Sequence, residues 1–534
     1  MFRHLNVHHP GLEMGVMTTH AEASAATLPA PGLNVSARAV TVPAVVALAA
    51  FAALLLIVGP RHEAWFDEAQ AWLVGRDVSL WTLLTERLPY EGTPALWHGL
   101  LWLLSHAGMP FSWLWAVSAA FACAGAWIIL TRAPFPFWLR VGVIFSYFVA
   151  YQYAIVARSY ALDLLLIPLL AATFADRLRR PVLYGVLLGL CANINVHSLV
   201  IAAVLSAEFV VAAWRSGAWR RAHVLGGTIS LLLGCLAARQ AFPPPDSSFA
   251  DATFLMGERG QLMIAEAFID RLDILSQLPP SDNTLTFGAL VSLVLLAPTI
   301  MLVTRAGVSL VVCALFAGLI GFSVVKYANA WHGGLLFLVW IFALWIGWGT
   351  LRELSSAERR LVIGSVALIV FVNVFYTGCA ALRDIREPYS AGPAAAKHLV
   401  HDTPIAAAGF KTFAVQPWFD ANLFQNYHHG TPLVAYYTWR KGTTFRPDST
   451  LEFWRALVAE GRYGSLLLSN HTLGPDLLGQ YLAVAREAGY CKSAEFPGGL
   501  IWKSYVRESD GLIIFRRCGG TAQSRAGSNG DLVR

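Results

Sequence analysis

Charged residues are scarce in this chain. Only 13% of its 534 residues are Asp, Glu, Lys or Arg, whereas a soluble globular domain typically has about 25%. This deficit excludes an ordinary soluble protein. The net charge of +6 is modest and comes largely from Arg clusters between hydrophobic runs, so we expect no nucleic-acid partner.

Several catalytic motifs are also missing. No Gly-rich phosphate loop precedes a helix, and the chain has neither an HExxH zinc motif nor a CxxC pair. Cysteines are few, and five of the seven lie in hydrophobic runs, where they act as small apolar residues. The other two, Cys491 and Cys518, lie in a polar region and could form a disulfide if that region is outside the cytoplasm.

Long hydrophobic runs are what the chain has instead. They recur from Val40 to Ala380, and each is close to the ~20 residues that a membrane-crossing helix needs. The 19 Trp residues suit the aromatic belts found at membrane interfaces. We therefore predict a mainly α fold, a polytopic membrane helical bundle.

The composition changes at both ends of this bundle. Residues 1–39 and 519–534 lack apolar stretches and are predicted to be disordered tails, the first of them cytoplasmic rather than a cleaved signal peptide. Residues 40–380 form the membrane domain, with an outer loop at 60–111. Residues 381–518 alternate short apolar runs such as "PIAAAGF", "SLLLSN" and "GLIIFRR" with helix-like stretches, which predicts a small α/β domain.

Arginine-rich loops set the expected topology, because short loops of this kind stay in the cytoplasm. They contain Arg177, Arg179 and Arg180; Arg215, Arg220 and Arg221; Arg305; and Arg352, Arg359 and Arg360. The N-terminus is then cytoplasmic, and the C-terminal domain lies outside. We predict about eleven membrane spans, with residues 93–104 in the outer interface. The alternative is about thirteen spans, if residues 94–157 form further short crossings.

An acidic pair, Asp67-Glu68, stands in "RHEAWFDEAQAW" just after the first span. Carboxylates in a first helical turn are held ionised by the free amide groups there, as a base or a metal ligand must be. Their aromatic surroundings favour a catalytic role over simple helix capping. A divalent cation held by Asp67 or Glu68 is also possible, although the spacing specifies none.

Other polar side chains are predicted to share the outer membrane face. Arg158 and Lys326 are each either an interfacial anchor or a phosphate-binding group, and Tyr160 and His332 lie close to them in sequence. Positive charge usually avoids the outer side, which favours the phosphate role. A cavity or acceptor site is predicted from four further residues: Glu91, His98, Asn195 and His197.

The order of these motifs resembles a known family. "DEAQ", "GTPALWHGLLWLL", "ARSYAL", "NVHS" and "KYANAWHG" follow one another across about residues 40–350. This pattern resembles the GT-C glycosyltransferases, in particular the branch of protein O-mannosyltransferases, aminoarabinose transferases and rhizobial-type sugar transferases. Relatives often carry two consecutive prolines where this chain has Pro94 followed by Ala95.

The resemblance implies an inverting sugar transfer from a polyprenyl-phosphate lipid at the outer face of the inner membrane. Asp67 would then be the general base for a hydroxyl of a glycan, lipid or protein acceptor, and Glu68 would orient it or help to hold a cation. Arg158, Lys326 and His332 would hold the lipid phosphate. Two alternatives remain: a transporter or flippase of a lipid-linked glycan, and an O-antigen-type polymerase or ligase that uses the loop at 241–285.

Overall fold

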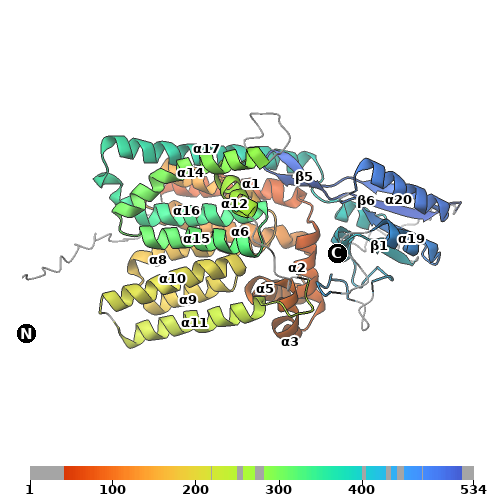
Figure 1. Cartoon of the computed structure of the whole chain (residues 1–534), viewed down its shortest axis with the longest axis horizontal. Coiled ribbons are helices and arrows are strands. Elements are labelled where there is room, and N and C mark those ends of the chain that lie inside the picture. Colours follow the sequence, from red (N-terminus) through yellow and green to blue (C-terminus); the bar gives the residue numbers. More distant parts are fainter. Residues whose placement is uncertain are drawn as a thin grey trace, which may run out of the picture. The chain divides into compact units, whose positions relative to one another are not determined.

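A computed structural model describes residues 41–217, 219–248, 257–270, 282–399, 404–427, 434–441, 450–471 and 473–519 (Figure 1). The tails predicted at 1–39 and 519–534 lie outside these residues, apart from Gly519. The chain divides into two units, and every described residue belongs to the second, Val40–Arg534.

Seven helical segments in the described part of the chain are long and apolar enough to cross a membrane: Val42–Arg61, Phe111–Arg132, Val196–Arg215, Arg221–Ala241, Thr284–Arg305, Ala330–Glu353 and Ser356–Arg386. They correspond to α1 (Val42–Val58), α6 (Leu114–Arg132), α10 (Val196–Arg215), α11 (Arg221–Ala241), α14 (Asp282–Arg305), α16 (Gly333–Gly347) and α17 (Ser356–Arg386). Large apolar side chains on these segments remain exposed, including Val294 and Phe371, as expected of surfaces that face lipid. The prediction of a mainly helical fold is confirmed, and these apolar segments are consistent with a membrane protein.

Shorter helices alternate with these segments along the chain. They are α2 (Phe66–Asp77), α3 (Leu80–Thr82), α4 (Leu88–Glu91), α5 (Ala95–His106), α7 (Phe137–Ile144), α8 (Tyr160–Thr173), α9 (Pro181–Ala192), α12 (Gly257–Phe268) and α15 (Ser309–Val325). Of these, α9 and α15 are apolar but short for a crossing. The predicted count of about eleven spans therefore stays a prediction.

Glycines let some helices approach closely. A Cβ atom on Gly185 of α9 would lie 2.1 Å from the carbonyl oxygen of Gly226 on α11, and one on Gly125 of α6 would lie 2.0 Å from that of Leu164 on α8. Small residues at such crossings allow backbone-to-backbone packing in membrane bundles. The packing of α8 bears on the site described below, because Arg158 lies two residues before the start of this helix.

The C-terminal region contains a four-stranded sheet of order β1-β2-β6-β3. The three apolar runs noted above form β1 (Ile405–Ala408), β2 (Ser465–Ser469) and β6 (Leu512–Arg517), and β3 spans Tyr490–Phe496. Strands β1 and β2 are parallel, whereas β6 is antiparallel to both β2 and β3. The helices of this region are α18 (Gly392–Ala396), α19 (Leu451–Ala459) and α20 (Pro475–Glu487), and Cys491 and Cys518 form a disulfide.

A separate hairpin joins this region to the helices. It consists of β4 (Gly499–Trp502) and β5 (Tyr505–Ser509). Its tip is Lys503, which has a left-handed backbone (φ 54°) and a buried ammonium group. That group donates to the backbone oxygen of Glu266 on α12 at 2.8 Å and lies 3.2 Å from its carboxylate, which also accepts from the Trp502 indole at 2.8 Å. The hairpin is thereby anchored in the helical bundle.

Candidate functional site

The two acidic side chains at the start of α2 have different environments. Glu68 is 1% exposed, and its carboxylate accepts from the backbone N–H groups of Trp65 at 3.1 Å and Ala157 at 2.6 Å. The first bond caps the N-terminus of α2. The second ties α2 to the segment that leads into α8. Glu68 is thus held within the protein rather than presented to a ligand.

His62 completes this buried arrangement. Its Nε2 lies 3.1 Å from Glu68, and its Nδ1 lies 2.9 Å from Asp384 on α17, which also accepts from the Tyr151 hydroxyl at 3.1 Å. Burial by itself lowers the pKa of His62, but Asp384 and Glu68 outweigh it and raise this pKa to about 10. A histidine cation therefore links the loop after α1 to both α2 and α17.

Asp67 lies one residue earlier and is more accessible, with 25% of its side chain exposed. Its carboxylate is 2.9 Å from the guanidinium of Arg158. Burial raises the pKa of Asp67, and the positive charge of Arg158 opposes that shift. The structure thus pairs two residues that are far apart in sequence and were predicted to share one face.

Aromatic rings surround this ion pair. The Arg158 guanidinium carbon lies 5.9 Å from the ring of Trp65, 5.2 Å from Trp331 and 5.4 Å from Tyr160. The two indoles are themselves 5.9 Å apart in an edge-to-face arrangement. Such rings hold a cation in place while leaving its N–H groups free to bind a ligand.

Two predicted histidines lie beside the ion pair. His197 and His332 stack with ring centroids 4.2 Å apart, and His332 is 5.9 Å from the ring of Tyr160. The Nδ1 atom of His332 accepts from the backbone N–H of Asn329 at 2.7 Å, so the neutral ring carries its proton on Nε2. The structure therefore brings Arg158, Tyr160, His197 and His332 together from three separate segments.

Glu91 is hydrogen-bonded to the helix that carries Asp67. Its carboxylate accepts from Gln70 at 3.0 Å, and Gln70 is on the same face of α2 as Asp67. Burial raises the pKa of Glu91 to about 7, despite the opposing effect of Arg87. Glu91 thus can exchange a proton near neutral pH, close to the candidate base.

The remaining predicted residues have other surroundings. Asn195 is buried, where its side chain caps α10 and donates to Asp163 at 3.0 Å. His98 is buried in α5, and its Nδ1 has no hydrogen-bond partner among the described residues. Lys326 ends α15, and its backbone oxygen accepts from Arg259 at 2.9 Å. Among the residues that the structure describes, no contact joins Asn195 or His98 to Asp67.

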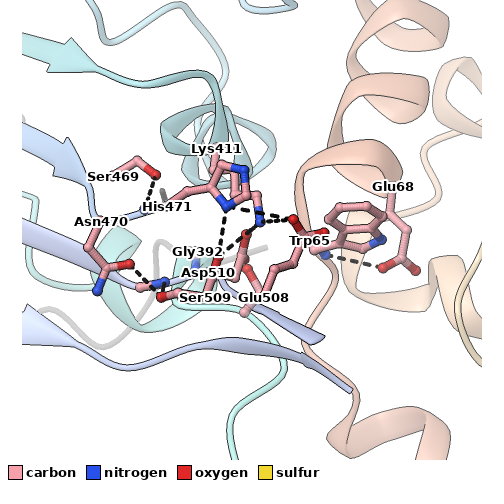
Figure 2. Close-up of polar contacts among 12 residues, drawn as sticks. Trp65, Glu68, Gly392, Lys411, Ser469, Asn470, His471, Glu508, Ser509 and Asp510 are labelled. Atoms are coloured by element: carbon pink, nitrogen blue, oxygen red, sulfur yellow. Dashed lines mark hydrogen bonds and ion pairs between the residues drawn. The ribbon is translucent and has the colours of Figure 1, made fainter. Parts of the chain in front are cut away.

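The C-terminal region contributes cations that the sequence did not reveal. Lys411 is 1% exposed, lies 5.8 Å from the Trp65 ring, and has Glu508 at 3.7 Å and Asp510 at 3.4 Å (Figure 2). Burial raises the pKa of Asp510 to about 6, although Lys411 lowers it. Arg507, on β5, lies 5.8 Å from the Trp331 ring. Both cations therefore approach the same pair of indoles as Arg158.

A small hollow lies between these groups. It is lined by Trp65, Gln152, Trp331, Tyr389, Leu500, Ile501, Trp502 and Arg507. Its walls thus come from the loop before α2, from the segments before α8 and α16, and from the hairpin β4–β5.

The predicted cation at the acidic pair has no support from a ligand cluster. Within the described ranges, no group of three or more His, Cys, Asp or Glu side chains is placed to hold a metal ion. Glu68 already uses its oxygens in hydrogen bonds to backbone amides and His62.

Sequence inspection missed several members of this site. His62 and Trp65 stood beside the acidic pair in "RHEAWFDEAQAW", so their proximity was a usable signal. Asp384, Lys411 and Arg507 gave none, because each stands in a segment without a recognisable motif. A search with protein-family models and against curated proteins finds no match to this chain.

Proposed function

We propose that this chain is an integral membrane glycosyltransferase. Its substrates would be a sugar carried on a polyprenyl phosphate and an acceptor hydroxyl on a glycan, a lipid or a protein. The transfer would invert the configuration and take place at the outer face of the inner membrane. The observation that carries this proposal is the 2.9 Å pair between Asp67 and Arg158 inside an aromatic enclosure.

Each member of the pair has a role in such a reaction. Asp67 would take the proton of the acceptor hydroxyl as it attacks the anomeric carbon, and the phosphate would leave as an anion on the other side of the sugar. Arg158 would stabilise that anion, together with His332 through the proton on Nε2. A positioned base contributes ~10² to 10⁴-fold, and charge stabilisation of the leaving group is commonly at least as large.

The ion pair also suggests how the base is activated. Arg158 opposes the rise in the pKa of Asp67 while the two groups are paired. A phosphate bound to Arg158 would weaken that pairing and make Asp67 more basic. The base would then be strongest when the donor is in place.

The test is Asp67→Asn in the purified full-length protein, with transfer measured from a polyprenyl-phosphate sugar pool. We expect transfer to fall by at least ~10²-fold with no change in unfolding temperature. Asp77→Asn, at the other end of α2, is the matched control and should retain transfer. Full activity in Asp67→Asn would refute the assignment.

One observation favours a transporter as the second candidate. Asp163 of α8 is fully buried and accepts from Ser198 at 2.7 Å and Asn195 at 3.0 Å, and carboxylates inside apolar helices often serve transport. Its hydrogen bonds, however, fasten α8 to the N-terminus of α10, which is a structural use. Movement of a labelled lipid-linked glycan across proteoliposomes without sugar transfer would favour the transporter.

A further inference from the structure

The start of α2 packs against the C-terminal region. Trp65 lies 5.8 Å from the Lys411 ammonium group, and the rings of Phe66 and Phe410 are 4.8 Å apart. Asp67 follows these two residues of α2 directly in the sequence. Charged groups of the C-terminal region therefore lie close enough to act on the carboxylate of Asp67.

Glu508, on strand β5, is a carboxylate that the proposed reaction has not used. Its side chain is 29% exposed, and it has Lys411 and His471 at 3.7 Å each (Figure 2). Both distances are longer than a hydrogen bond, and none of the described residues donates a hydrogen bond to Glu508. Its negative charge therefore acts on the groups around it.

The strand that carries Glu508 is fixed at both ends. At the tip of the hairpin, Lys503 is bonded to α12. At the other end, the buried ammonium group of Lys411 donates to the backbone oxygen of Ser509 at 2.9 Å and lies 3.4 Å from Asp510. The Glu508 carboxylate is thus held at a set position, as a preorganised electrostatic effect requires.

The charges around Asp67 act on its proton affinity in opposite directions. Burial has the largest effect and raises the pKa of Asp67, and Arg158 lowers it. Glu508 raises this pKa by more than Lys411 lowers it, and by more than the adjacent Glu68 raises it. The two charges from the C-terminal region therefore raise the pKa of Asp67 when taken together. The charged and titratable groups that interact electrostatically with Asp67 are Arg158, Glu508, Lys411, Glu68, Glu91, Tyr160 and Tyr327.

We propose that Glu508 is a positioning residue for the base, a fixed carboxylate of the C-terminal hairpin that keeps Asp67 basic in the presence of Arg158. An aspartate paired with an arginine is a weak base, and a like charge nearby offsets that weakness. Lys411 holds the hairpin that presents Glu508. The inference rests on the proposed function for the use of Asp67 as a base, but not for the electrostatic coupling between the two carboxylates.

The experiment measures the titration of Asp67 itself. Full-length protein in lipid nanodiscs is titrated by infrared difference spectroscopy, and comparison with Asp67→Asn assigns the carboxyl band. Glu508→Gln removes the negative charge, which makes Asp67 easier to deprotonate, so we expect the midpoint to move to lower pH by about 0.5 pH unit or more. Glu508→Asp keeps the charge and should restore most of the parent midpoint. Glu452→Gln, at the exposed start of α19, is the matched control and should titrate as the parent does.

The pH profile of transfer gives a second readout. In Glu508→Gln, the acid limb of kcat/KM for the polyprenyl-phosphate donor should move with the infrared midpoint, and the plateau should fall about two-fold or more because a weaker base accepts the proton less readily. A merely structural role would lower the rate by one factor at every pH and leave the midpoint unchanged. Unfolding temperatures are measured for each variant, and Glu508→Thr, which suits a strand, replaces Glu508→Gln if that variant is unstable.

The outcomes separate this inference from the proposed function. An unchanged midpoint in the folded neutral variant would overturn the inference and leave the role of Asp67 as a base standing. An equal shift in Glu508→Gln and Glu508→Asp would also overturn it, because the charge would then not be the cause. A shifted midpoint in a protein without transferase activity would instead refute the proposed function, while the coupling between Glu508 and Asp67 would stand.

Discussion

The carboxylate of Glu68 accepts a hydrogen bond from the backbone N–H of Ala157 at 2.6 Å. Asp67 immediately precedes the first of these residues and Arg158 immediately follows the second. One hydrogen bond therefore sets the distance between the start of α2 and the start of α8. The acidic pair divides into a positioning residue, Glu68, and a candidate base, Asp67.

Replacement of Glu68 should accordingly disturb both folding and the site. Glu68→Ala leaves the Ala157 amide and the Nε2 atom of His62 without a partner, and breaking a buried ion pair of this kind typically costs about 3–5 kcal/mol. Glu68→Gln keeps an oxygen that can accept from the Ala157 amide, so this variant should lose less stability than Glu68→Ala. This ranking of the two variants can be checked by thermal unfolding in detergent. The transfer rate is measured on the fraction that remains folded. Equal stability in the two variants would argue against the positioning role.

The buried His62 should make stability depend on pH. The pKa of His62 in the folded protein, about 10, is above the ordinary value of 6.5. Its contribution to the free energy of unfolding is therefore complete below about pH 6.5 and is lost as the pH rises through 10. The unfolding temperature of the parent should thus fall more steeply over this interval than that of His62→Gln. The exposed His106→Gln is the control and should follow the parent. Parallel curves for the parent and His62→Gln would contradict the charged state of His62.

Much of the helical bundle and the C-terminal sheet could be predicted from hydrophobic run length and short apolar segments. Runs of about 20 residues leave few alternatives to a crossing helix, and "SLLLSN" bounded by polar residues forms β2. The number of crossings is less determined, since α8, α9 and α15 are each shorter than a full span.

The site was predictable only where its residues cluster in sequence. Asp67 and Arg158 could be proposed because each stands beside other polar or aromatic residues near a span end. Their contact depends on the Ala157 backbone amide, and the approach of Arg507 depends on the anchoring of Lys503 at Glu266. Such long-range tertiary bonds leave no local pattern, so neither the burial of Glu68 nor the contribution of the hairpin was foreseen.

Replacement of Arg158 should affect the two substrates unequally. Arg158→Ala removes a cation that would contact the donor phosphate, and hydrogen bonds to charged groups contribute about 1.5–3 kcal/mol each. The KM for the polyprenyl-phosphate donor should rise about ten-fold or more, with a smaller change in the KM for the acceptor. Steady-state kinetics with each substrate varied in turn provides the measurement, and Arg179→Ala, in an exposed loop, is the control. Equal effects on both constants would exclude a phosphate role.

The last prediction concerns the side of the membrane on which the C-terminal region lies. Cys491 and Cys518 form a disulfide between β3 and the residue after β6, and such bonds persist in oxidising compartments outside the cytoplasm. An alkaline phosphatase fused after residue 390 should therefore be active in a bacterial host, because that enzyme also needs oxidised cysteines, and a fusion within the Arg-rich loop at 177–180 should be inactive. Mass spectrometry of thiol-alkylated protein should find Cys491 and Cys518 unmodified until a reductant is added. An inactive fusion at 390 together with free thiols would place the region in the cytoplasm, where a lipid-linked donor at the outer face could not reach Asp67.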